Sequence, residues 1–104
     1  MKYQIIDSKD YCDIAIIENL RNSSVDFPIE VYEIEQELRV NWKSSLEIPR
    51  DIDELFVIVS ADLRDYKKQI IKELYSEFRK FVDRRIIITL VCKIDGKLVV
   101  LYGR

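Results

Sequence analysis

Residues 32–43, YEIEQELRVNWK, alternate between apolar and polar side chains along their whole length. Five of the six even positions from 32 to 42 are apolar, and none of the six odd positions from 33 to 43 is. Side chains alternate between the two faces of a β-strand, whereas at about 100° per residue the same positions would scatter around most of a helix. The pattern therefore predicts a strand whose solvent face carries Glu33, Glu35 and Glu37.

The N-terminal part of the chain predicts a short strand followed by a helix. Residues 3–6 are typical of a strand, and Asp7 or Ser8 offers a side chain that can cap a following helix. Apolar residues at positions 14, 17 and 20 match helical spacing. We therefore expect a helix that runs to about Arg21.

Residues 25–31 alternate as well, but with their apolar side chains on odd positions. The change of parity after position 31 predicts a bulge or a hairpin break there, because a one-residue slip turns the apolar side chains to the other face. Pro28 cannot donate a ladder hydrogen bond, so this part is expected at a sheet edge or a bulge.

The C-terminal half predicts a strand, a long helix and a hairpin. Residues 55–59 are continuously apolar, as in a central strand that is covered on both faces. Residues 63–82 carry one apolar stripe at helical spacing, and residues 86–94 form a second buried strand. Asp95-Gly96 is a two-residue hairpin signal that leads into a strand over residues 97–102.

Together these elements predict one α/β domain over residues 1–104, of the mixed α+β type. We expect a mixed sheet of about five strands, two helices and a C-terminal β-hairpin. If the strands at 55–59 and 86–94 are parallel in one sheet, the crossover through the long helix should be right-handed.

Composition narrows the available chemistry. The chain has 48% apolar residues, a formal net charge of −2, two cysteines and no histidine. Without histidine, Ser-His-Asp and Cys-His sites and the commonest zinc sites are excluded. The two glycines rule out a glycine-rich phosphate loop. We therefore expect no catalytic residue, no metal and no cofactor, although carboxylate, lysine or tyrosine chemistry stays open.

Cys12 and Cys92 lie eighty residues apart, and no CxxC pair occurs. Two separate buried thiols are the favoured interpretation, with a disulfide as the alternative. No apolar run approaches the roughly 20 residues that a membrane span needs, and the N-terminus lacks the pattern of a secretory signal. These observations predict an intracellular protein without membrane contact.

One flank of the long helix carries a basic ridge of Arg64, Lys68, Lys72 and Arg79 beside Tyr75. Four cations on one face are a candidate contact for nucleic-acid phosphates, and such binding would be strongly salt-dependent. The alternative is a solvated face whose cations pair with nearby carboxylates.

The acidic side chains Glu33, Glu35 and Glu37 allow three interpretations. They form a solvated strand face, a device against edge-to-edge aggregation, or a surface for a basic protein partner. Side chains two positions apart on a strand stay nearly 7 Å apart, which is too far for one cation to bridge them unaided.

The predicted element order resembles that of restriction-endonuclease-like nucleases. In that comparison Glu18 is the acid on the first helix, Asp26 is the first metal-binding acid, and Asn41-Trp42-Lys43 stands where an acid-any-lysine motif is expected. The chain departs from the motif because Asn41 replaces the acid, and Glu37-Leu38-Arg39 has arginine in place of lysine. The resemblance implies, at most, a divergent metal-dependent nuclease.

The composition is also similar to that of small accessory proteins encoded by AT-rich viruses of hyperthermophilic archaea. The chain has sixteen isoleucines, two alanines and one threonine, together with abundant lysine, glutamate and tyrosine. This resemblance concerns origin only.

The leading hypothesis for function is a non-enzymatic interaction protein, a homodimer or a binder of another protein through a sheet edge and its charged faces. Nucleic-acid binding and the divergent nuclease are the alternatives.

Overall fold

The computed structural model describes residues 2–22, 32–59, 66–82 and 85–103, with the backbone alone at 20–22 and 32–34. It contains six strands, one α-helix and one 3₁₀ turn within those ranges. In chain order the elements are β1 (Tyr3–Asp7), η1 (Ser8–Asp10), β2 (Cys12–Asn22), β3 (Tyr32–Trp42), β4 (Glu54–Val59), α1 (Lys68–Lys80), β5 (Ile87–Ile94) and β6 (Lys97–Tyr102).

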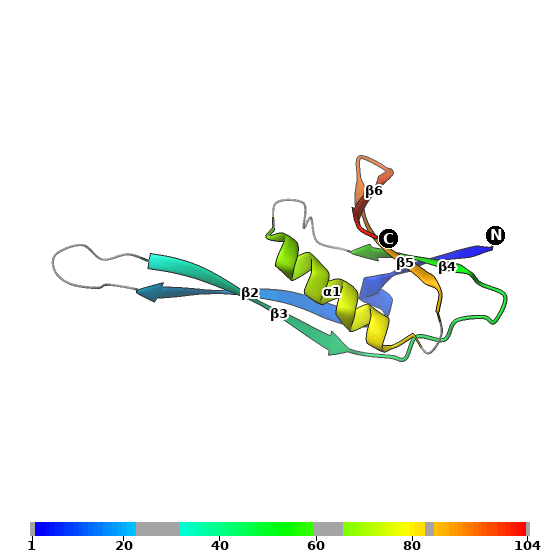
Figure 1. The fold of residues 1–104 in the computed structure, drawn as a ribbon, viewed down its shortest axis with the longest axis horizontal. Helices are drawn as coiled ribbons and strands as arrows, with labels where there is room; N and C mark the ends of the chain where they lie inside the picture. Colours follow the sequence, from blue (N-terminus) through cyan, green and yellow to red (C-terminus); the bar gives the residue numbers. More distant parts are fainter. Residues whose placement is uncertain (1, 23–31, 60–65, 83–84, 104) are drawn as a thin grey trace.

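The strands form two separate sheets (Figure 1). A four-stranded sheet has the order β1-β4-β5-β6, in which β1, β4 and β5 are parallel and β6 is antiparallel to β5. The second sheet is the antiparallel pair of β2 and β3. The fold is therefore a small α+β arrangement with a mixed sheet.

The helix α1 packs on one face of the four-stranded sheet. Leu55 pairs with Ile88 and Val57 pairs with Leu90, so these four side chains point to the same face, and all are fully buried. The apolar stripe of the helix meets them there. It consists of Ile71, Leu74 and Phe78.

The β2–β3 pair packs on the same core through the apolar row near its base. Cys12 pairs with Trp42, Ile14 with Val40, and Ile16 with Leu38, and these side chains contact the core cluster. The Trp42 ring lies 5.3 Å from the Phe78 ring, edge to face, which is a favourable aromatic arrangement. The helix stripe is thus shared between the sheet and the hairpin.

Beyond this contact the β2–β3 pair continues as an arm away from the rest of the chain (Figure 1). Each strand has 11 residues, which corresponds to about 36 Å at the usual rise of a strand. The molecule measures 62 × 29 × 23 Å, and its radius of gyration is 16.9 Å. A globular domain of this length would have a radius of gyration near 13 Å, so the arm accounts for the elongated shape.

The helix predicted to end near Arg21 is wrong, because this segment forms β2. Its sequence also fits a period of two: positions 12, 14 and 16 are apolar and face the core, while Asp13 and Ala15 are exposed. Pairing with β3 selects that period, since it satisfies the backbone groups of both strands. The predicted five-stranded sheet with two helices is accordingly replaced by sheets of four and two strands and one α-helix in the described residues.

Most of the other predicted elements are confirmed. The strand at 32–43 is β3, the central strand at 55–59 is β4, and the long helix is α1, which begins at Lys68. Asp95 and Gly96 have positive φ angles of 50° and 78°, as a two-residue hairpin turn with both residues left-handed requires. The predictions for residues 25–31 and for a bulge at Pro28 lie outside the described residues.

Phe78 offers a test of the shared core. Replacing Phe78, which is 0% exposed, with alanine should lower the free energy of unfolding by roughly 3–5 kcal/mol, because both the sheet and Trp42 lose contacts. Phe81→Ala is the matched control, since Phe81 also contacts Trp42 but is 42% exposed, and its loss should cost roughly 1 kcal/mol. Equal losses in urea unfolding would show that Phe78 is not central to the fold.

Candidate functional site

The face of the four-stranded sheet opposite α1 is the most distinctive surface of the protein. Register defines it: Tyr3, Glu54 and Ile87 lie in one row, and they alternate with the residues that face the helix. The helix α1 and the β2–β3 pair contact the other face. Near the centre of this face Thr89 and Val91 are nevertheless buried, at 8% and 2% exposed. Its members from β1 to β6 are Tyr3, Ile5, Asp7, Glu54, Phe56, Ile58, Ile87, Thr89, Val91, Lys93, Leu98 and Val100, which we call the open face.

Apolar side chains of the open face are exposed along its margins. Val100 is 63% exposed, Tyr3 60% and Ile5 45%. Leu98 and Ile87 are exposed as well. A sheet face of this kind is normally packed on a core, and several exposed apolar side chains on one face indicate an interaction site.

The sequence contained a signal for this surface, although the open-face residues were not predicted as a site. The continuous apolar runs of β4 and β5 are typical of strands that are covered on both faces. The structure supplies a helix on one face only. The second face of the sheet, which the apolar runs predicted to be buried, is partly exposed in the described part of the chain.

The charges of the open face lie near its ends. Glu54 is the first residue of β4, and Lys93 lies near the end of β5, beyond the last described residue of β4. Asp7 is on the edge strand β1, where it caps η1 by accepting from the backbone N–H of Lys9 at 3.1 Å. Glu54 and Lys93 therefore lie at opposite ends of the face, whereas Asp7 shares a row with Ile58 and Val91, toward the Lys93 end.

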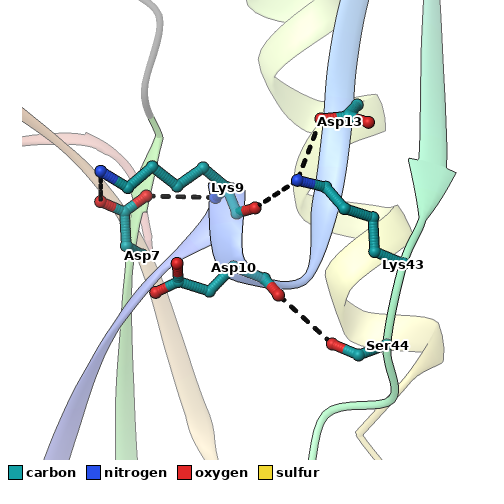
Figure 2. Close-up of polar contacts among 6 residues, drawn as sticks. All are labelled: Asp7, Lys9, Asp10, Asp13, Lys43 and Ser44. Carbon is teal, nitrogen blue, oxygen red and sulfur yellow. Dashed lines mark hydrogen bonds and ion pairs between the residues drawn. The ribbon is translucent and has the colours of Figure 1, made fainter.

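The base of the arm is fixed by polar contacts around Lys43 (Figure 2). Its Nζ donates to the Lys9 carbonyl at 2.7 Å and forms an ion pair with Asp13 at 3.2 Å. The Ser44 hydroxyl donates to the Asp10 carbonyl at 3.3 Å. These contacts tie the end of β3 to the turn between β1 and β2, so the Lys43 ammonium has a structural role.

Both cysteines are free and buried, as predicted. Burial raises the pKa of the Cys12 thiol from 9.0 to about 11, with a further increase from the Asp13 carboxylate and an opposing effect of Lys43. Very little thiolate is present near neutral pH at such a pKa, so Cys12 is not suited to nucleophilic chemistry.

The predicted basic ridge is only partly assembled. Lys68 and Lys72 are exposed on α1, whereas Arg64 lies outside the described residues. The Arg79 guanidinium donates to the Ile86 carbonyl at 2.5 Å, where it fastens the end of the helix to the start of β5. Tyr75 packs edge to face on Tyr102, so it does not present a free stacking platform beside the lysines.

The predicted solvent face of β3 is confirmed where side chains are described. Glu35 and Glu37 are exposed on the outer face of the arm, and Arg39 on the same face forms an ion pair with Glu37 at 3.8 Å. Backbone register places Glu33 opposite Arg21, in the same row of positions. The three acidic positions are therefore consecutive on this face, and an arginine position lies at each end of the row: Arg21 opposite Glu33, and Arg39 beyond Glu37.

The residues of the nuclease resemblance do not come together. Glu18 pairs with Gln36 far along the arm. Gln36 lies seven residues before Lys43, which corresponds to about 23 Å along an extended chain. Asn41 lies on the opposite face of β3 from Trp42, and Asp26 is outside the described residues. Among the described side chains, no group of three or more acids or cysteines is close enough to hold a metal ion.

Two adjoining grooves run between β3 and α1. The larger has a volume of about 430 Å³, with Leu38 and Val40 on one side and the outer surface of α1 on the other. The smaller, about 250 Å³, contains Gln36 and Lys67. Charges of both signs line these grooves.

The chain shows no match when it is compared with known protein families, curated proteins and solved structures. Within the described residues, α1 and η1 are both too short and too polar to cross a membrane.

The raised pKa of Cys12 predicts a specific loss of stability at high pH. Between about pH 9 and pH 11 the thiol ionises in the unfolded chain but stays protonated in the folded one, so the unfolded state is favoured as pH rises. Urea unfolding across this range should show a steeper decrease for the native sequence than for Cys12→Ala. Parallel pH profiles of the two proteins would contradict the assignment.

Proposed function

We propose that the protein is a non-enzymatic interaction module that self-associates by stacking the open face of its four-stranded sheet on the same face of a second copy. The exposed apolar margin of this face, above all Val100, Tyr3 and Ile5, is the observation that carries the proposal. Burying these side chains between two sheets removes apolar surface from water, as in a β-sandwich.

The distribution of charge favours a second copy as the occupant. Glu54 and Lys93 lie at opposite ends of the open face. If the second sheet is stacked with its strands reversed, the end that carries Glu54 of one copy lies over the end that carries Lys93 of the other. This two-fold arrangement brings opposite charges together twice and keeps the apolar middle of each face against its counterpart.

The size of the face sets the expected affinity. Four strands about 4.8 Å apart and about five residues long cover roughly 300 Å² in projection. Stable complexes bury about 800 Å² of accessible surface per partner, so this interface is small. A dimer that dissociates in the micromolar range or above is therefore expected.

Sedimentation velocity with Val100→Lys tests the proposal. The unmodified protein should shift from monomer to dimer between about 10 µM and 1 mM, in line with a small interface. Val100→Lys should remain a monomer, because the ammonium would be buried against an apolar sheet. Val99→Lys is the matched control: Val99 is the preceding residue on β6, is 38% exposed and faces the helix side of the sheet, so this variant should still dimerise.

A charge exchange tests the orientation of the two copies. Glu54→Lys should weaken dimerisation, because two like charges then face each other at each end of the interface. The double variant Glu54→Lys with Lys93→Glu restores opposite charges and should recover the native dissociation constant. Failure of the double variant to recover dimerisation would reject the reversed stacking, and dimerisation of Val100→Lys at native affinity would reject the open face altogether.

A further inference from the structure

A hollow of about 490 Å³ lies where α1 meets the beginning of the parallel strands. It lies on the helix side of the sheet, at the end where β4 and β5 begin. Its volume falls in the range of small-molecule sites. The lining residues are Asp53, Tyr75, Arg79, Arg85, Ile86 and Ile87.

Two guanidinium groups face this hollow. Arg79 is half-buried, and one of its nitrogens, Nη1, is held by the Ile86 carbonyl, so the group has a fixed position and keeps further N–H donors. Arg85 is exposed and has no ion-pair partner among the described residues. Two arginines beside one cavity are suited to an oxyanion, because guanidinium N–H groups match the geometry of phosphate and carboxylate oxygens.

The remaining walls differ in chemistry from the arginines. Asp53 is held by its backbone, which donates to the Lys2 carbonyl at 2.9 Å and accepts from the Ile87 N–H at 3.0 Å. Its carboxylate accepts from the backbone N–H of Lys2 at 3.4 Å and has further lone pairs available as acceptors beside the arginines. The Tyr75 ring is fixed against Tyr102 with 4.9 Å between their centroids, and Ile86 adds apolar surface.

We propose that this hollow binds a small organic phosphate ester. The phosphate oxygens accept from Arg79 and Arg85, a hydroxyl of the organic part donates to Asp53, and the carbon skeleton lies along Tyr75 and Ile86. The net charge of the lining is +1, from two arginines and one aspartate, so a free inorganic phosphate satisfies only part of the site. The ester uses the carboxylate as well, and this distinguishes it from any simple anion.

Calorimetric or NMR titration with ribose 5-phosphate, inorganic phosphate and ribose tests this site. The ester should bind at least tenfold more tightly than inorganic phosphate, and ribose alone should not bind measurably below 10 mM. Arg85→Gln should weaken binding of the ester at least tenfold. Arg79 is a poorer choice for this test, since its loss also removes the bond to Ile86 and can unfold the chain.

Two further variants make the outcome decisive. Arg39→Gln, an exposed arginine on the outer face of the arm, is the matched control and should bind the ester like the native protein. Asp53→Ala should weaken the ester but not inorganic phosphate, because it removes the acceptor for the hydroxyl and also a negative charge. No binding of the ester at 10 mM, equal affinity for inorganic phosphate, or an unchanged affinity in Arg85→Gln would each overturn the proposal.

Discussion

The structure depends on one constraint: a single helix supplies the apolar stripe on which two β layers must pack. Leu74 and Phe78 of α1 are fully buried against the four-stranded sheet, and Phe78 also meets Trp42 of the β2–β3 pair. Without the helix, neither the sheet nor the arm has a partner for its apolar side. The core is therefore one cluster, in which both layers are fixed by the same few side chains.

Chain connectivity explains why only one face of the sheet is covered. The parallel strands lie in the order β1-β4-β5, so the chain moves across the sheet in one direction. Connections of the same hand between strands that progress in one direction lie on the same face. The β2–β3 pair forms the first connection and α1 lies in the second, and both contact the same core. Neither connection thus covers the second face, whose margins expose Tyr3, Ile5 and Val100, and stacking of a second copy would bury them.

The sequence predicted correctly those elements whose side-chain pattern fits only one kind of secondary structure. The alternation of β3, the stripe of α1 and the Asp95-Gly96 turn each had one interpretation, and the structure contains all three. The β2 segment failed because its isoleucines fit both periods: positions 14, 17 and 20 suit a helix, whereas 12, 14 and 16 suit a strand. Only the pairing with β3, which is not local information, decides between them.

Surface predictions were limited for a related reason. Of the predicted basic ridge, Lys68, Lys72 and Arg79 lie on α1, and Arg64 is outside the described residues. The Arg79 side chain reaches a carbonyl seven residues away in sequence, and no helical periodicity predicts that contact. The open face was indicated only indirectly, by strands apolar on both sides. Its identification required the strand order, because the order shows which face the connections leave uncovered.

The most direct test of the account is an isotope-filtered NMR experiment on an equimolar mixture of labelled and unlabelled protein at millimolar concentration. We expect intermolecular contacts between methyl groups of the open face, such as those of Ile5, Ile87 and Val100. We expect none from Leu74, which is buried between α1 and the sheet. A spectrum without intermolecular contacts from the open face would contradict it.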